Sequence, residues 1–313
     1  MGTPEFAVPS LRALVHGGYN VVGVVTTPDR EAGRGLKIHE SDVKIAAREL
    51  GLPVLQPEKL RDEEFQAALR EWRPDLGIVI AFRMLPESVW AMPRLGTFNL
   101  HASLLPQYRG AAPINRAIID GRTETGVTTF LLNREIDKGA IIARRREPIL
   151  PEDNAGTLYD RLMNIGSELV IETVECIASG DCTPEIQENV DESTLSPAPK
   201  IFKEDCLIDW RAEGHRIVNL IRGLSPYPAA WTRIFRDGAE CGTAKIFAAT
   251  FEPAESAAAA PGTVVSDGRT FMKVRCADGY MCLGSVQIAG KKRLGIRELL
   301  AGFRDPEMYS FEI

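Results

Sequence analysis

Short apolar segments alternate with amphipathic segments through the first half of the chain. The apolar segments have the length and composition of strands buried on both faces of a parallel sheet, and they cover residues 21–25, 53–55, 76–82 and 97–101. Between them, apolar residues recur at helical spacing in 41–50 and 61–72, and Ser41 stands where a helix N-cap belongs. Strands that alternate with helices predict a doubly wound, mostly parallel α/β sheet.

The pattern changes in the second half of the chain. An amphipathic stretch at 154–179 predicts a long helix, and the residues that follow it are acidic and contain prolines, which indicates a linker. Further on, five short strand-like runs are separated by turns, at residues 230–235, 243–250, 262–266, 271–276 and 281–286. Such runs are typical of a small β-barrel of the OB type. We therefore expect an α/β domain over residues 1–184, a linker over 185–204 and a barrel domain over 205–313.

The charge balance differs between the two expected domains. The chain of 313 residues has a net charge of −6, from 37 Lys and Arg against 43 Asp and Glu. From Asp205 onward there are 14 Lys and Arg against 13 Asp and Glu, so the acidic excess belongs to the part before it. A neutral to basic second domain permits contact with RNA but does not require it.

The cysteines and the hydropathy indicate a protein of the cytoplasm. The six cysteines include no C-x-x-C pair, and no histidine lies near the two C-x5-C pairs. We therefore expect reduced thiols, with neither a zinc site nor a disulfide framework. No apolar run approaches the roughly 20 residues that span a bilayer, and no secretory signal is recognisable at the N-terminus.

The stretch TFNLHASLLPQYRGAAP, residues 97–113, carries the candidate chemistry. Asn99 and His101 are two residues apart on an expected strand, so they share one face near its carboxyl end. Ligands of open α/β sheets bind outside the carboxyl ends of strands. Taken alone, a histidine on an apolar strand is more often a satisfied core residue. An amide beside an imidazole nevertheless suits a carbonyl under attack, because one group holds the oxyanion and the other moves a proton.

A longer resemblance supports the catalytic interpretation. FNLHASLLPQYRGAAPINRAIIDGRTETGVTTF resembles the signature region of the folate-dependent formyltransferases. The likeness covers essentially the whole chain and includes MGTPEFAVPSL, TTPDREAGRG, IRGLSPYPAAWT and AGKKR. It implies transfer of a formyl group from 10-formyltetrahydrofolate to the free amino group of methionyl initiator tRNA, for translation initiation. The barrel motifs and the TTPDREAGRG loop favour this branch of the family.

The resemblance also implies a set of catalytic residues. Asn99 would donate a hydrogen bond to the formyl oxygen, and His101 would stabilise that oxygen and assist proton movement. Asp137 lies in the expected turn NREIDKG, between strands at 126–132 and 140–146, and an aspartate in such a turn usually serves the turn itself. It aligns with the Asp-x-Gly element of the family, as the partner of His101 and the acceptor of the amine proton.

Two segments would bind the folate. The loop after the catalytic strand is one, with Ser103, Leu104, Leu105 and Pro106. The other would receive the pterin after the strand at 76–82, with Phe82, Arg83, Met84 and Leu85. The family usually has Ala-Tyr-Gly and one more residue here, whereas this chain has Ala-Phe-Arg. No metal is needed, and no cluster of ligands is recognisable.

Basic residues in two places would contact the tRNA. Arg30, Arg34 and Lys37 lie in a polar, glycine-rich segment that resembles the tRNA-contacting loop of the family, although its composition alone describes a mobile surface loop. Lys291, Lys292 and Arg293 follow what we expect to be the last strand of the barrel. Such a short basic run is more often a solvated turn, and its place after an OB-like barrel favours RNA.

The chain departs from the family at its start. The family has an apolar strand before the Gly-Thr-Pro-Glu-Phe loop, whereas this sequence begins at the loop. Loss of a central parallel strand would expose apolar surface, so we expect the coding start to lie upstream.

Other functions remain open at the level of the residues. Formyltransferases that act on glycinamide ribonucleotide or amino sugars, and the hydrolase-type domain of formyltetrahydrofolate dehydrogenase, share the catalytic half. A non-catalytic RNA-binding module would keep a basic barrel without a reason to keep Asn99, His101 and Asp137 together. We expect a monomer.

Overall fold

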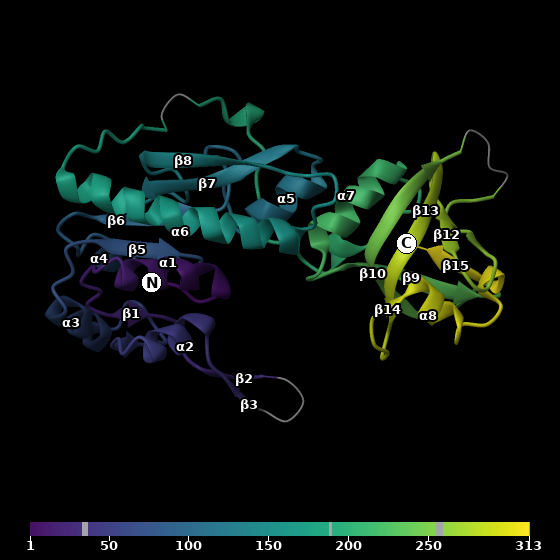
Figure 1. The fold of residues 1–313 in the computed structure, drawn as a ribbon, viewed down its shortest axis with the longest axis horizontal. Coiled ribbons are helices and arrows are strands. Elements are labelled where there is room, and N and C mark those ends of the chain that lie inside the picture. Colours follow the sequence, from purple (N-terminus) through teal and green to yellow (C-terminus); the bar gives the residue numbers. More distant parts are fainter. Residues whose placement is uncertain (33–36, 188–189, 255–258, 313) are drawn as a thin grey trace. The chain divides into compact units, whose positions relative to one another are not determined.

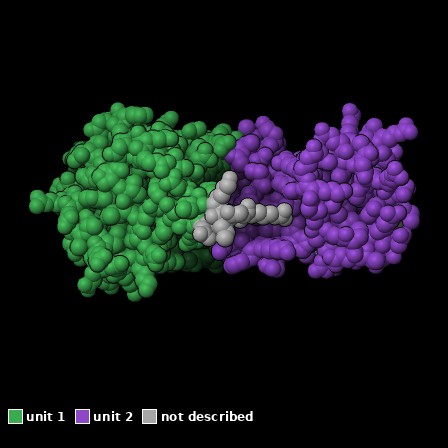
Figure 2. Space-filling view, turned by 90° about the horizontal axis from the view of Figure 1, so that it is seen from below, with its two compact units in different colours: residues 1–113, 124–148, 159–198 green, residues 114–123, 149–158, 199–313 purple. Residues whose placement is uncertain are grey.

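The computed structural model describes residues 1–32, 37–187, 190–254 and 259–312. The chain forms two compact units, coloured separately in Figure 2. The first comprises residues 1–113, 124–148 and 159–198, and the second comprises 114–123, 149–158 and 199–313. The predicted fold class is confirmed, because the first unit is a Rossmann-like α/β domain and the second contains a nearly closed antiparallel barrel.

The first unit begins with short strands between helices, of which β2 and β3 form an antiparallel pair (Figure 1). The strands β1 and β4 pair in parallel, with Val24 opposite Val54. Ser41 is the predicted N-cap, since its side chain accepts a hydrogen bond from the Lys44 amide. The elements of this part are η1 (Glu5–Ala7), α1 (Val8–His16), β1 (Val24–Val25), β2 (Arg30–Ala32), β3 (Lys37–His39), α2 (Asp42–Glu49), β4 (Val54–Leu55) and α3 (Glu63–Glu71).

The rest of the first unit is a four-stranded sheet in the order β5-β6-β7-β8. β5 and β6 are parallel, whereas β6, β7 and β8 pair antiparallel, so the sheet is mixed. The helix α6 covers one face of the sheet (Figure 1). There the hydroxyl oxygens of Thr173 on α6 and Thr129 on β7 are 2.8 Å apart. The elements are β5 (Gly77–Ile80), α4 (Glu87–Trp90), β6 (Thr97–His101), β7 (Glu124–Leu131), β8 (Ile141–Pro148), α6 (Ala155–Ser179) and η2 (Glu192–Thr194).

Met1 and Gly2 join the two groups of strands. The Gly2 amide donates to the Val25 carbonyl on β1 at 3.1 Å, and the Ile80 amide on β5 donates to the Met1 carbonyl at 2.9 Å. A Cβ on Gly2 would lie 2.8 Å from the Cβ of Ala7, so only glycine permits this close approach. The two strand groups are therefore continuous through one parallel bridge, Gly2 to Ile80.

The second unit is built on a strongly bent antiparallel sheet in the order β11-β12-β13-β10-β9-β15. Its two edges meet where Thr263 pairs with Ser310, so the barrel is nearly closed. Trp210, Ile217 and Phe311 are among the side chains that fill its core. The elements are α5 (Pro113–Ile119), η3 (Glu204–Cys206), α7 (Gly214–Leu224), β9 (Ala230–Arg236), β10 (Ala239–Pro253), β11 (Val264–Ser266), β12 (Met272–Arg275), β13 (Gly279–Ile288), β14 (Leu294–Gly295), α8 (Ile296–Leu300), η4 (Pro306–Met308) and β15 (Tyr309–Glu312).

Three expectations about local structure are wrong. The run at 21–25 is a strand only at Val24–Val25; Val21 and Val22 are half-buried, and a Cβ on Gly23 would lie 2.4 Å from the Trp72 ring. The basic run at 291–293 does not follow the last strand, since β14 and β15 come after it. Both of these strands are short, at two and four residues, so each gives only a weak signal in the sequence.

The third correction concerns the cysteines. Cys176 and Cys182 form a disulfide with a Cα–Cα distance of 5.3 Å. Cys176 is in the last turns of α6, and Gly180, with φ of 79°, reverses the chain after the helix and returns Cys182 to it. The other four cysteines are free thiols. Among the described residues, no helix is long and apolar enough to cross a membrane.

Candidate active site

The strand β6 presents Asn99 and His101 on one face, as their spacing predicts. In the antiparallel pairing with β7, Asn99 is opposite Phe130 and His101 is opposite Thr128. His101 is buried, with 6% of its surface exposed, and Asn99 is half-buried. A solvent-shielded imidazole thus lies beside an amide that a ligand can reach.

The hydrogen bonds of His101 determine the position of its proton. Nε2 is 2.8 Å from the Tyr108 carbonyl oxygen, which only accepts, so Nε2 carries hydrogen. The other ring nitrogen, Nδ1, lies 3.9 Å from Oδ2 of Asp137. The side chains of His101 and Asp137 are 7% and 14% exposed, so water screens this pair weakly. The imidazole is therefore held at one end and faces a carboxylate at the other.

The Asp137 carboxylate is oriented by the loop that follows β6. Its Oδ2 accepts a hydrogen bond from the Gly110 amide at 2.9 Å. The backbone of Asp137 is left-handed, with φ of 54°, in the turn between β7 and β8. In the same turn a Cβ on Gly139 would lie 1.6 Å from the Leu131 carbonyl, so glycine is required there. The turn is a constrained element, and this constraint fixes the direction of the carboxylate.

The loop after β6 is anchored on the sheet. The Thr128 hydroxyl donates to the Ser103 carbonyl at 2.6 Å and accepts from the Leu105 amide at 3.1 Å. Leu105 packs in the core, and a cis peptide bond joins it to Pro106. Tyr108 has φ of 60° and supplies the carbonyl for His101. Among the predicted folate residues, Ser103 and Leu105 are buried and Leu104 is half-buried.

The second predicted folate segment lies beside the Asp137 turn. Glu87, at the start of α4, accepts two hydrogen bonds at 3.0 Å from the guanidinium of Arg134, in the turn. Within the segment, Leu85 is buried, Phe82 is half-buried and Met84 is 72% exposed. Two loops from separate strand ends are thus joined next to the catalytic candidates.

The guanidinium of Arg83 turns away from that neighbourhood. It donates to the Glu58 carbonyl at 2.7 Å and also to the Pro57 carbonyl. Burial lowers the pKa of Arg83, and its Nε atom is buried without a hydrogen-bond partner. Arg83 therefore attaches this segment to the loop after β4.

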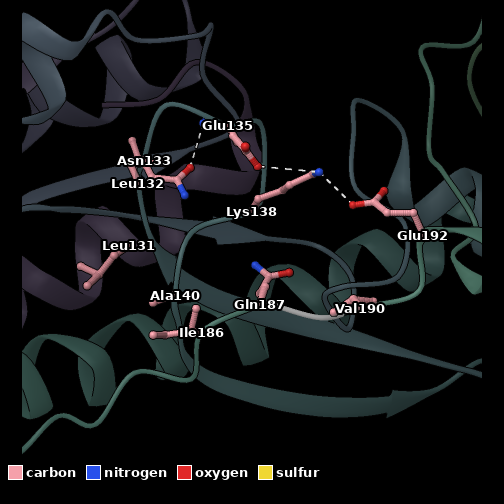
Figure 3. Close-up of a pocket in the computed structure, with 10 residues that line it drawn as sticks. All are labelled: Leu131, Leu132, Asn133, Glu135, Lys138, Ala140, Ile186, Gln187, Val190 and Glu192. Atoms are coloured by element: carbon pink, nitrogen blue, oxygen red, sulfur yellow. Dashed lines mark hydrogen bonds and ion pairs between the residues drawn. The ribbon is translucent and has the colours of Figure 1, made fainter.

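A cavity of about 580 Å3 adjoins the turn between β7 and β8, and Glu135 and Lys138 of this turn are among its lining residues (Figure 3). Lys138 reaches across it between Glu135 and Glu192, at 3.7 and 2.8 Å. The hydrogen bond from Lys138 lowers the pKa of Glu192, and the same bond raises the pKa of Lys138. Asn99, His101 and Asp137 do not line this cavity. No three His, Cys, Asp or Glu side chains of the described residues are grouped as metal ligands.

The predicted RNA contacts lie apart from these three residues in the chain. Arg30 is exposed at the start of β2, Lys37 begins β3, and Arg34 lies outside the described residues. In the second unit, Lys291, Lys292 and Arg293 are exposed between β13 and β14. The Arg293 guanidinium lies 4.3 Å from the centre of the Phe247 ring and donates to Ser285.

Sequence reasoning missed residues that surround Asp137. Arg109 donates to Glu192 at 3.1 Å and to Gln187 at 2.8 Å, and Gln187 also donates to the carbonyl of Asp137 at 3.1 Å. Arg109 follows β6 in the stretch that resembles the family signature, so its place in the sequence could have indicated it. Gln187 and Glu192 belong to the acidic stretch at 185–204, where nothing in the spacing distinguishes a site residue from a solvated linker.

Comparisons with known proteins agree on the family. The sequence model described as formyl transferase matches residues 1–174, and the model of the formyl transferase C-terminal domain matches residues 200–304. A methionyl-tRNA formyltransferase of Bacteroides fragilis is 55% identical over 313 residues, which cover 100% of this chain and 96% of the relative. That of Bacteroides thetaiotaomicron is 56% identical over 99% of this chain and 96% of its own length.

Solved structures show the same fold at low sequence identity. An N-formyltransferase of Helicobacter canadensis, bound to folinic acid and dTDP-3-aminofucose, has a TM-score of 0.63 and 19% identity, over 93% of this chain and 97% of that one. HypX of Aquifex aeolicus, in complex with tetrahydrofolic acid, has a TM-score of 0.59 and 22% identity, over 82% of this chain and 44% of that one. At this identity the likeness concerns the fold alone.

Proposed function

The chain belongs to the formyl transferase family, and we propose that it transfers the formyl group of 10-formyltetrahydrofolate to the amino group of methionyl initiator tRNA. The relatives that are more than half identical over nearly the whole chain carry the name of this activity. The observation that carries the chemistry is the arrangement of His101 between the Tyr108 carbonyl and the Asp137 carboxylate.

The reaction needs one oxyanion site and two proton movements. The methionyl nitrogen attacks the formyl carbon and forms a tetrahedral centre, in which the former carbonyl oxygen carries the negative charge. Asn99 donates a hydrogen bond to this oxygen, and His101 lies on the same face to stabilise it. Both contacts strengthen as the negative charge develops on the oxygen, so they stabilise the transition state more than the bound substrates and lower the barrier.

Collapse of the tetrahedral centre breaks the bond between the formyl carbon and N10 of the folate. Asp137 accepts the proton that the attacking amine loses, and this proton passes through a water molecule to Nδ1 of His101, across the gap of 3.9 Å from Oδ2. His101 then gives the proton to N10 as the folate leaves. The cycle closes with both side chains in their starting states.

We assign folate binding to the two loops beside these residues. The backbone of the segment Phe82, Arg83, Met84 and Leu85 would pair with the pterin, and Ser103, Leu104, Leu105 and Pro106 would bound the site on the other side. The Arg134–Glu87 ion pair supports this assignment, because it joins the pterin segment to the Asp137 turn. The exposed side chain of Met84 offers an apolar surface for a flat heterocycle.

We assign the tRNA to the basic residues of both units. Arg30, Arg34 and Lys37 would contact phosphates near the acceptor end, and Lys291, Lys292 and Arg293 would contact phosphates along the barrel. Exposure of Arg30 and of the run 291–293 supports the assignment. The division into a catalytic domain (1–184), a linker (185–204) and a tRNA-binding barrel (205–313) belongs to the same proposal, as do a monomeric state and a cytoplasmic location.

A turnover assay tests this function. The purified chain is incubated with 10-formyltetrahydrofolate and methionyl initiator tRNA, and the product is separated on an acid gel. We expect formylated methionyl-tRNA and no formylation of glycinamide ribonucleotide or of an amino-sugar nucleotide. Binding of tRNA without product would instead favour a non-catalytic RNA-binding module, and turnover of either small substrate would favour another branch of the family.

A further inference from the structure

The side-chain amide of Gln187 makes three hydrogen bonds around the Asp137 turn. Its Nε2 donates to the Asp137 carbonyl at 3.1 Å and to the Gly139 carbonyl at 2.7 Å. Its Oε1 accepts from Nη2 of Arg109 at 2.8 Å. Because the guanidinium only donates and the carbonyls only accept, the orientation of this amide is unambiguous. Figure 3 shows Gln187 at the edge of the cavity, below Lys138.

These bonds reach both loops that place the Asp137 carboxylate. One loop is the turn between β7 and β8, which contains Asp137 itself, and Gln187 binds its backbone. The other is the loop after β6, in which Arg109 binds Gln187 while the adjacent Gly110 amide donates to the carboxylate. Gln187 therefore bonds both Asp137, which bears the carboxylate, and Arg109. The residue next to Arg109 is Gly110, whose amide orients that carboxylate.

The backbone around Gln187 is itself anchored. Glu185 exchanges two hydrogen bonds of 2.7 Å with Ile141 on β8, so Gln187 lies two residues from a fixed point. Further along, the Ala198 amide donates to the Arg109 carbonyl at 2.8 Å. Glu185 is therefore attached to the sheet and Ala198 to the loop after β6, and the side-chain amide of Gln187 lies next to the first of these anchors.

We propose that Gln187 is a positioning residue that sets the distance between the Asp137 carboxylate and the His101 ring. The inference rests on the proposed formyl transfer and deepens it. The left-handed backbone of Asp137 costs conformational energy, and the two bonds to the turn carbonyls hold it in place. Without them, the carboxylate relaxes away from Nδ1, while the folate and tRNA contacts stay intact.

Steady-state kinetics with three variants test this role. A displacement of about 1 Å costs on the order of 100-fold in rate, so Gln187→Ala is expected to lower kcat by about 10- to 100-fold with both KM values within about twofold. Gln187→Glu keeps the size and the Arg109 contact but places a carboxylate oxygen against two carbonyl oxygens, so it is expected to fall equally. Ile186→Ala, at the adjacent and 65% exposed position, is the matched control and is expected to keep wild-type kinetics.

Two kinetic outcomes would overturn the role. If Gln187→Ala keeps kcat within about twofold, the carboxylate does not depend on this amide. If KM rises while kcat is unchanged, Gln187 acts in binding and not in positioning. The thermal melting temperatures of the two Gln187 variants and the control are measured as well. Equal melting temperatures mean that a change in kcat or KM does not come from a folding defect.

Hydrogen–deuterium exchange gives a readout that needs no activity. We expect residues 133–140 to exchange faster in Gln187→Ala than in the wild type or Ile186→Ala, at an unchanged melting temperature. Unchanged exchange overturns the positioning role. A wild-type chain that forms no formylated tRNA, while the exchange difference is observed, refutes the proposed function and leaves the structural role of Gln187 standing.

Discussion

His101 and Asp137 face one another from different strand ends, with Nδ1 of the histidine 3.9 Å from Oδ2 of the aspartate. The distance is longer than a hydrogen bond. Nε2 is held by the Tyr108 carbonyl, whereas Nδ1 faces the carboxylate. The pair is therefore arranged for a proton to move between ring and carboxylate with a water molecule between them.

Replacement of this carboxylate tests the pair directly. Asp137→Asn keeps the shape and an acceptor for the Gly110 amide, but it removes the base that receives the amine proton. We expect kcat to fall by about 100-fold or more, in line with general acid–base contributions of about 10² to 10⁴. Single-turnover formylation of methionyl-tRNA measures it. Glu135→Gln is the control and should remain active, since this carboxylate of the same turn lies 3.7 Å from the Lys138 ammonium.

Asn99→Asp tests the proposed oxyanion donor. The variant is nearly isosteric, yet it replaces a hydrogen-bond donor by an acceptor that repels the developing charge. Loss of one such donor costs about 10² to 10³ in turnover, and we expect at least that decrease. The same formylation assay measures kcat, and a circular dichroism melt verifies the fold. A variant with more than a tenth of wild-type kcat would remove Asn99 from the mechanism.

The basic run of the barrel is expected to act through phosphate contacts. Lys291→Ala combined with Lys292→Ala should weaken tRNA binding and lower the slope of log K against log salt by about 2, because each phosphate contact contributes about 0.9. Arg293 is kept, since it packs on Phe247. Arg211→Ala, whose guanidinium is paired with Asp209, is the control. Filter binding at several salt concentrations is the measurement, and an unchanged slope would exclude this run from the interface.

Acid should destabilise the first unit through one charged cluster. Hydrogen bonds from Lys44 lower the pKa of Asp29 and of Glu40, and the hydrogen bond to Asp29 raises the pKa of Lys44. A carboxyl whose pKa is lower in the folded chain stabilises it above the unfolded pKa, and this contribution is lost as the pH falls through the folded pKa. The midpoint of urea unfolding should therefore drop as the pH falls below about 5, and the drop should continue through the lowered pKa values of the two carboxyls.

A lysine variant isolates that cluster. Lys44→Met removes the partner of both carboxyls, so the drop in the urea midpoint on acidification should be smaller than in the wild type. Lys59→Met, at an exposed lysine of the same unit, should leave the drop unchanged. Equal drops in the wild type and Lys44→Met would mean that other groups control the acid transition.

The disulfide predicts how many thiols of the chain react before and after reduction. Of six cysteines, four are free, so a thiol reagent should titrate four groups in denaturant without reductant and six after reduction. Cys182→Ser removes a short cross-link, and the shorter the closed loop the smaller the gain, so we expect a loss of about 2 kcal/mol in the free energy of unfolding. Cys241→Ser, at an exposed free thiol, should lower the count by one without that loss. Six reactive thiols before reduction would contradict the pairing.

The local pattern of the chain was sufficient for much of the first unit. Ser41 was predicted as an N-cap and bonds the Lys44 amide, because a cap depends only on residues within one turn. The alternation of apolar and amphipathic runs predicted β4, β5, β6 and α6 for the same reason. By contrast, β15 was missed, since its place at the edge of the barrel depends on pairing with β9, far away in the sequence.

In the candidate site, too, some features follow from the local sequence and others depend on the tertiary structure. The sequence by itself determined that Asn99 and His101 share a face, because neighbours on a strand alternate sides whatever the rest of the chain does. Only the tertiary structure decided that Asp137 lies within 3.9 Å of His101, and that Gln187 and Arg109 surround its turn. These contacts join segments from separate strand ends and from the stretch expected to be a linker. Their geometry depends on how the sheet brings the segments together, which no short stretch of sequence encodes.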